Sequence, residues 1–344
     1  MHKTTFVSTL SLLTAVFTLH CGGDAAGVPG PVDPSDPVDP ATPGEQAAAP
    51  PDAPDAPDTT PPSVVSIAPA DGSKGVRADT KIVLTFSEPM DRAATEAAWA
   101  SEQLPGEKMS FAWNEAGTVL TVTPSSPLQY AEVADLQGDA KRYAVAVGTG
   151  AKDLAGNAMG QAASSEFFTL RSLFATAPLV PAASGRLHAS ATPSIVKNLA
   201  DYRVGDSAVN APLWGVFTFD VSALPKGAEV TEATFATRQI NILSAPYADL
   251  DGQAILSHTS FATMVPADVK AAAATPIGAL STDAALGPRS MDVSAAVAAD
   301  VADRVAKNDR TQFRLSFAKA SDGTGDVDAA DFLPPELSLK VLVP

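Results

Sequence analysis

Two stretches near the start of the globular sequence decide the fold. Residues 61–72 read Pro-Pro-Ser-Val-Val-Ser-Ile-Ala-Pro-Ala-Asp-Gly, and residues 81–86 read Lys-Ile-Val-Leu-Thr-Phe. The first is a short apolar run that ends in a turn cluster. In the second, Ile82, Leu84 and Phe86 share one face of a strand, because successive side chains of a strand point to opposite sides. Short runs of this kind, separated by turn residues, predict a β-sandwich.

Three later runs extend this pattern: Thr118 to Thr123, Tyr143 to Val147 and Glu166 to Leu170. Residues 61–72 resemble the opening of a bacterial Ig-like domain of the S-layer-associated, SbsA type. The segments at 86–91, 113–121 and 152–157 follow in the order and spacing of that family. The resemblance covers residues 63–170, with a small insertion at 129–141. It implies an Ig-like sandwich that serves as a spacer or adhesive unit.

Four polar residues in this part invite a cation hypothesis: Glu88, Asp91, Asp153 and Asn157. We favour a structural role for them. Asp91 is placed to cap a short helix over 92–98, and Asp153 and Asn157 are typical of residues that bond the backbone of a turn.

Residues 175–344 again predict β structure, with one helix from 295 to about 307 whose Val297, Val301 and Val305 share a stripe. The sequences at 217–235, 292–294 and 334–339 resemble a family of jelly-roll β-sandwich modules, of the DNRLRE or carbohydrate-binding type, found on microbial surface proteins. Trp214 stands near the place where that family usually has an arginine, and its tryptophan-rich tract is missing here. The resemblance implies a jelly-roll-like sandwich more firmly than it implies a ligand.

Sugar-binding sites stack a ring on an exposed aromatic side chain and hold the hydroxyl groups with polar side chains. Tyr202 and Tyr247 lie in polar, turn-rich sequence and are expected to be exposed, whereas Trp214 abuts a strand and is more typical of a core. The candidate ligand-binding residues are Tyr202, Arg203, Trp214, Arg238, Asn241 and Tyr247.

The acidic loop at 321–331 carries oxygen ligands of the kind that Ca²⁺ prefers, although its spacing departs from the EF-hand pattern. The candidate ligands of a structural Ca²⁺ are Asp322, Asp326, Asp328 and Asp331. A solvated loop without an ion is the alternative. We expect no other cofactor.

Composition excludes several classes of function. The 344 residues carry 23 Lys+Arg and 39 Asp+Glu, a formal charge of 23 − 39 = −16, which disfavours nucleic acid as a partner. One Cys and four His cannot build a disulfide framework or a thiolate zinc site. The sequence has no nucleophile elbow, zinc-protease motif or phosphate loop. We therefore expect no enzyme. A hydrolase or lyase of polysaccharides, which needs only two carboxylates, is a remote alternative.

The N-terminus is typical of an exported protein. Lys3 precedes an apolar run at 6–19, and the sole cysteine, Cys21, follows it. This arrangement resembles a lipoprotein signal peptide over 1–20 with Cys21 as the lipidated residue, although Thr18 and His20 depart from the usual lipobox. An ordinary secretory peptide is the alternative. Residues 21–62 carry 12 Pro and no Lys or Arg, which predicts an extended, disordered stalk.

These features together predict a lipid-anchored protein of the outer membrane or cell surface with a binding or adhesion role. The membrane is its partner through the lipid, and we expect a monomer. In the favoured hypothesis the C-terminal sandwich binds a polysaccharide. In the alternative, both sandwiches are spacers or bind a cell-surface protein, without a glycan ligand.

Overall fold

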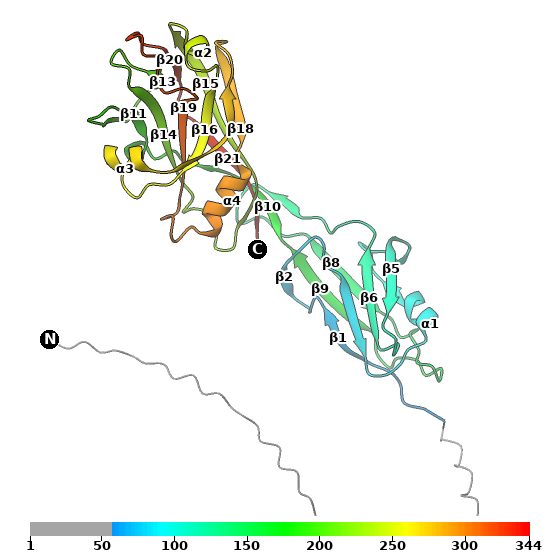
Figure 1. Ribbon diagram of the computed structural model, residues 1–344. Coiled ribbons are helices and arrows are strands. Elements are labelled where there is room, and N and C mark those ends of the chain that lie inside the picture. Colours follow the sequence, from blue (N-terminus) through cyan, green and yellow to red (C-terminus); the bar gives the residue numbers. More distant parts are fainter. Residues whose placement is uncertain (1–56) are drawn as a thin grey trace, which may run out of the picture. The chain divides into compact units, whose positions relative to one another are not determined.

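The computed structural model describes residues 57–344. The predicted signal peptide, the lipidated Cys21 and most of the predicted stalk lie outside the described residues. Two β-sandwich parts follow one another along the chain, and short helices occur only between strands (Figure 1). The all-β prediction is therefore confirmed.

The first part is an Ig-like sandwich of two four-stranded sheets. One sheet has the order β1 (Val64–Ala68), β3 (Ile82–Phe86), β6 (Val119–Pro124) and β5 (Met109–Trp113). The other has the order β2 (Ser73–Val76), β9 (Ala163–Thr169), β8 (Arg142–Val147) and β4 (Trp99–Ala100). Ile82, Leu84 and Phe86 are all buried in the core of this part. The alternation that predicted strand 81–86 is therefore confirmed.

Local polar residues behave here as turn and cap residues. Helix α1 (Arg92–Ala97) begins after Asp91, whose carboxylate accepts the backbone N–H of Ala94 at 3.0 Å. Both carboxylate oxygens of Asp153 accept hydrogen bonds from Asn157, one from its backbone N–H at 2.8 Å and one from its side chain at 2.7 Å. These contacts confirm the capping and turn roles predicted from the sequence. The 3₁₀ helix η1 (Gly106–Lys108) leads into β5.

The expected insertion at 129–141 contains strand β7 (Ala131–Val133). This strand pairs in parallel with β10 (Arg171–Ala177), the strand that opens the second part of the chain. The insertion therefore adds a short strand to the second sheet system.

The second part is built from β10 to β21, and β15 joins three of these strands. β15 (Glu229–Leu243) is the longest strand and pairs with β18, β20 and β21 along different parts of its length. The path of paired strands runs β17-β16-β19-β14-β13-β20-β15-β21-β10, with β11 attached at β14 and β12 paired with β11. The other strands are β11 (Gly185–His188), β12 (Ser194–Lys197), β13 (Tyr202–Asp206), β14 (Pro212–Asp220), β16 (Ala254–Thr259), β17 (Ala274–Ser281), β18 (Gly287–Asp292), β19 (Arg310–Phe317), β20 (Ala329–Phe332) and β21 (Glu336–Val343).

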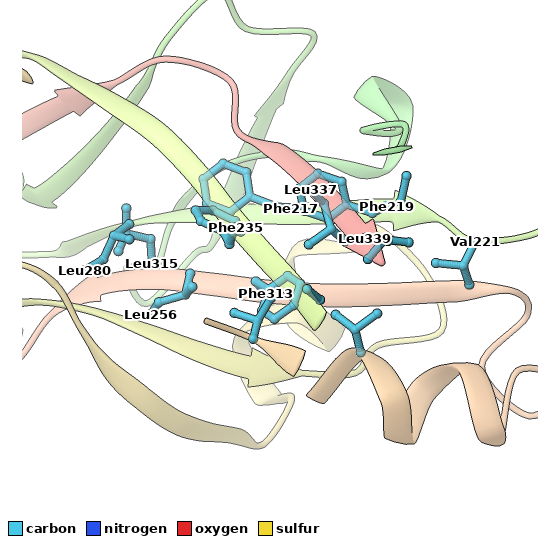
Figure 2. Packing of buried hydrophobic residues seen from close by; sticks show 14 of the residues in the cluster. Phe217, Phe219, Val221, Phe235, Leu256, Leu280, Phe313, Leu315, Leu337 and Leu339 are labelled. Carbon is cyan, nitrogen blue, oxygen red and sulfur yellow. The ribbon is translucent and has the colours of Figure 1, made fainter. Parts of the chain in front are cut away.

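The core of the second part is a group of phenylalanine rings (Figure 2). Phe235 lies between Phe217 and Phe313, with ring centroids 5.5 and 5.6 Å away and planes inclined at 62° and 66°. Phe219 contacts both Phe235 and Phe313 at 6.1 Å, also edge to face. This is the preferred geometry of aromatic pairs, because it brings a ring edge to a ring face. The rings come from β14, β15 and β19 and hold these strands together.

The helices of this part are short. They are η2 (Pro181–Ala183), α2 (Pro246–Asp249), α3 (Pro266–Ala271) and α4 (Ser294–Ala302). Val297 and Val301 of α4 are buried, as predicted, but the helix ends before Val305, which is 90% exposed. Asn308 and Asp309 adopt φ angles of 51° and 54°, and the chain turns there into β19. The predicted extension of the helix to residue 307 is wrong.

Within residues 57–344, no helix has the length and apolar composition needed to cross a membrane.

Candidate functional site

Three of the residues singled out in the sequence form one polar network on the second sandwich. The Arg203 guanidinium donates two hydrogen bonds to the Asp331 carboxylate, from Nε to Oδ1 at 2.8 Å and from Nη2 to Oδ2 at 3.0 Å. The side-chain amide of Asn241 donates to Asp331 Oδ2 at 3.0 Å. We call Arg203, Asn241 and Asp331 the polar network.

Strand register brings these residues together. On β13 and β20, Arg203 lies opposite Asp331, and the neighbouring pair is Tyr202 and Phe332. Tyr202 and Phe332 are buried in the core, so the alternation of the strands directs Arg203 and Asp331 to the other face.

A β-bulge brings the third member into register. Gln239 of β15 lies opposite Phe332 of β20, but the next pair is Asn241 with Asp331. The extra residue, Ile240, is skipped in the ladder. Without the bulge an isoleucine would face the Asp331 carboxylate.

The network holds a nearly buried charge. The Asp331 side chain is 7% exposed and that of Arg203 is 33% exposed. Burial alone would raise the pKa of Asp331, but the hydrogen bonds from Arg203 and Asn241, and the positive charges of Arg203 and Arg186, hold this pKa below its usual value. The pKa of Arg203 is raised, chiefly by its hydrogen bond to Asp331. The ion pair is therefore fully formed at neutral pH.

The two tyrosines are not the exposed platforms that the sequence predicted. Tyr202 is 1% exposed, and its ring packs edge to face on Phe217 with centroids 4.8 Å apart. Tyr247 is half-buried against Phe317, and its hydroxyl lies 2.7 Å from Ser281 Oγ. Polar neighbours misled the prediction for Tyr202, because alternate residues of a strand face opposite sides.

The other two predicted ligand-binding residues, Trp214 and Arg238, are not part of the polar network. Trp214 of β14 is half-buried, and the Arg314 guanidinium covers its ring at 4.3 Å from the centroid. A sugar cannot stack on the covered face. Arg238 is exposed on β15, three residues before Asn241. The structure thus gathers Arg203 and Asn241 from the predicted ligand-binding set, and adds Asp331 from the predicted metal set.

The predicted calcium ligands separate into three groups. Asp331 belongs to the polar network, and Asp326 is exposed in the loop. Asp322 and Asp328 come together with Asp206, which the sequence analysis did not single out. A single aspartate at the end of a strand gives no local sequence pattern from which a metal site could be predicted.

A second group of carboxylates lies on the Ig-like part, formed by Asp58, Glu88 and Asp153. Here both oxygens of Asp153 are already bonded to Asn157. The pKa of Glu88 is raised, first by burial and then by the charges of Asp58 and Asp153. The hydrogen bonds between Asp153 and Asn157 give Asp153 a structural role in a turn, so this group needs no metal ion to account for it.

Residues 58–169 match the family described as Bacterial Ig-like domain. This match confirms the resemblance noted for residues 63–170 and identifies the first sandwich as a bacterial Ig-like module. None of the curated proteins matches the chain.

Three solved structures illustrate the remaining likeness. An L,D-transpeptidase from Mycobacterium smegmatis is 15% identical, with 64% of this chain and 75% of that chain covered and a TM-score of 0.24. Domains 1–6 of the surface layer protein SbsC are 18% identical, with 51% and 27% covered and a TM-score of 0.22. SGBP-B, from a complex xyloglucan utilization locus in Bacteroides uniformis, is 12% identical, with 80% and 72% covered and a TM-score of 0.21. At these scores the likenesses carry no argument about function.

Proposed function

We propose that this chain, which carries a bacterial Ig-like module at residues 58–169, is an exported, lipid-anchored binding protein of the cell surface. In this proposal the Ig-like module is a spacer, the second sandwich carries the binding face, and the protein acts as a monomer. The ligand of that face is a polysaccharide.

The polar network is the observation that supports a polysaccharide ligand. Arg203 is one-third exposed and Asn241 is exposed, so both side chains reach solvent while Asp331 holds them in place. The two bonds to Asp331 use Nε and Nη2 of Arg203, and Asn241 uses its amide nitrogen. The Arg203 Nη1 donor and the Asn241 carbonyl oxygen take no part in these bonds. A fixed donor beside a fixed acceptor matches the paired hydroxyl groups of a sugar.

The experiment is retention of the purified full chain in gels that contain one polysaccharide each. Asn241→Ala removes an exposed amide, and Arg203→Gln removes the guanidinium. Arg142→Gln is the matched control, since Arg142 is an exposed arginine of β8 on the Ig-like module. We expect one polysaccharide to retard the wild type and Arg142→Gln, and to lose most of that retardation with the other two variants. Equal retardation of all four proteins would contradict the proposed face.

The lipid anchor is supported by sequence alone, since Cys21 lies outside the described residues. A cysteine directly after an apolar export segment is the acceptor that lipoprotein processing requires. Several acyl chains on one cysteine would hold the protein stably at a membrane. Cys21→Ser should abolish incorporation of a labelled fatty acid and move the protein from the membrane fraction to the soluble fraction. Unchanged labelling of the variant would contradict the anchor.

A second candidate function is supported by the burial of the tyrosines. Phe174, which is 59% exposed, is the one aromatic residue among residues 171–344 that lies mostly on the surface, and Lys340 Nζ lies 5.3 Å from its ring centroid. A face without stacking platforms suits a spacer or a protein-binding surface better than a sugar site built on aromatic rings. If no polysaccharide retards the wild type, this second candidate replaces the first.

A further inference from the structure

The strongest unassigned feature is the group formed by Asp206, Asp322 and Asp328, which we call the acidic cluster. One carboxylate oxygen from each residue lies within 4.8 Å of the others. Asp206 ends β13, Asp328 directly precedes β20, and Asp322 lies in the loop between β19 and β20. In Figure 1, β13 and β20 lie next to each other at one end of the second part, and α2 lies at the same end.

Burial makes this cluster different from an ordinary acidic loop. Asp206 is completely buried and Asp328 is 1% exposed. The Oδ2 atom of Asp206 is buried without any hydrogen-bond partner. A buried carboxylate oxygen without a donor is costly, because it has lost its water and gained nothing in return. An unpaired, buried carboxylate oxygen of this kind is available as a ligand for a cation.

In each carboxylate of the acidic cluster, the Oδ1 atom accepts a backbone hydrogen bond. Asp206 Oδ1 accepts the backbone N–H of Asp328 at 3.0 Å, and Asp328 Oδ1 accepts the backbone N–H of Ala245 at 2.9 Å. Asp322 Oδ1 accepts the backbone N–H of Thr324 at 2.9 Å. Backbone donors of this kind fix the orientation of the three carboxylates, as outer hydrogen-bond partners do for the ligands of metal sites.

The charge around the cluster is also unbalanced. Asp249, at the end of α2, is a fourth carboxylate close to Asp328 and Asp322. Lys319 brings a single positive charge, which acts on Asp249 and Asp322. Four carboxylates and one lysine leave an excess of negative charge at this end of the sandwich.

We propose that the acidic cluster binds one Ca²⁺ ion through Asp206, Asp322 and Asp328. Oxygens bind Ca²⁺ at roughly 2.3–2.6 Å, so two ligands of one ion lie at most about 5 Å apart, as they do here. Mg²⁺ demands a smaller and more regular shell, and it keeps several waters. A site assembled from three separate loop and strand positions suits the larger, more flexible shell of Ca²⁺. Asp326 and Asp331, expected as ligands from the sequence, are not part of this site.

The ion would join two strand ends that also carry the polar network. Asp206 lies three residues after Arg203 on β13, and Asp328 lies three residues before Asp331 on the chain that enters β20. The backbone N–H of Asp206 donates to the carbonyl oxygen of Asp328 at 2.8 Å, so the two residues pair directly. Calcium would therefore stabilise this strand pair whether or not the face binds a polysaccharide.

Thermal unfolding of the full chain tests the proposal without any glycan. Extracellular Ca²⁺ modules bind with dissociation constants of roughly 0.1–1 mM, so 10 mM Ca²⁺ should raise the transition of the second sandwich by about 3–10 °C relative to chelator. Titration calorimetry with CaCl₂ alone should give one site per chain. Mg²⁺ at the same concentration should give a clearly smaller shift.

Variants separate the cluster from other acidic groups. Asp322 lies in a loop, so the variant Asp322→Asn should fold normally. It should lose most of the Ca²⁺-dependent shift in the unfolding transition. Asp206→Asn should do the same, and its transition in chelator should not fall below that of the wild type, because one of three repelling charges is gone. Asp326→Asn, exposed in the same loop, is the matched control and should keep the full shift. No Ca²⁺ shift in the wild type, an equal shift with Mg²⁺, or a full shift in Asp322→Asn would each overturn the proposal.

Discussion

Replacing Asp331 by Asn tests the physical basis of the polar network. The substitution keeps the shape of the side chain but removes the charge that receives two hydrogen bonds from Arg203. Breaking a fully buried ion pair costs about 3–5 kcal/mol, whereas an exposed pair contributes about 0–1 kcal/mol. Because the Arg203 side chain is 33% exposed and Asp331 only 7%, we expect an intermediate loss of about 2 kcal/mol. For a domain of this size that loss lowers the melting temperature by about 4–8 °C.

The pH dependence of this loss identifies its cause. The pKa of Asp331 is lowered in the folded protein, so the unfolded chain takes up its proton first, near the usual value of about 3.9. The stability that the ion pair adds is complete above that pH and disappears as the pH falls through the lower folded pKa. The melting temperatures of wild type and Asp331→Asn, measured by circular dichroism, should differ at pH 7. The difference should begin to shrink below about pH 4 and vanish once the pH falls below the lowered folded pKa. A difference that does not shrink as the pH falls below about 4, or a loss of less than 1 °C at pH 7, would refute the reasoning. Asp326→Asn, which removes an exposed aspartate, serves as the control.

Three further predictions concern the core, a tight strand contact and the ion pair. Phe235→Ala should lower the free energy of unfolding, measured in urea, by about 3–5 kcal/mol, because Phe235 contacts three other rings. Phe174→Ala, at an exposed position, should change this free energy by no more than about 0.5 kcal/mol. Gly205→Ala should lower the free energy of unfolding by about 3 kcal/mol or more and abolish the Ca²⁺ shift, because a Cβ atom there would lie 2.0 Å from the Asp328 carbonyl oxygen. The control is Gly227→Ala. Gly227 has open space around it but a φ of 77°, so this substitution should lower the free energy of unfolding by only about 1 kcal/mol. In a double-mutant cycle, Arg203→Gln and Asp331→Asn should show a coupling energy above about 1 kcal/mol, and a coupling near zero would show that their contact adds no stability.

Local patterns in the sequence predicted the Ig-like part well. Ile82, Leu84 and Phe86 alternate along one strand and are buried, and Asp91 caps the helix that follows it. Each of these features depends on residues within a few positions of one another. Strand periodicity and helix capping are properties of such short segments, so a single sequence is enough to find them.

The second sandwich depended more on contacts between distant residues. Tyr202 was expected on the surface, but its place in β13 directs it into the core. Asn241 faces Asp331 only because of a bulge in β15, which no local pattern in the sequence indicated. Asp206 joins Asp322 and Asp328 through the pairing of strands more than 120 residues apart. Register and bulges are set by the whole sheet, so these sites became visible only in the folded structure.

The most direct test of the central claim measures polysaccharide binding by the polar network. Asn241→Ala is the informative variant, since its exposed amide is removed while the Arg203–Asp331 ion pair remains. On the polysaccharide that retards the wild type most strongly, titration calorimetry with a derived oligosaccharide should show an affinity at least about fivefold weaker for Asn241→Ala, equivalent to about 1 kcal/mol. Its melting temperature should fall by no more than about 8 °C, because one hydrogen bond to Asp331 is lost while the ion pair remains, and Arg142→Gln should bind with unchanged affinity. Unchanged affinity in Asn241→Ala, or a wild type that binds no polysaccharide, would contradict the proposed binding face.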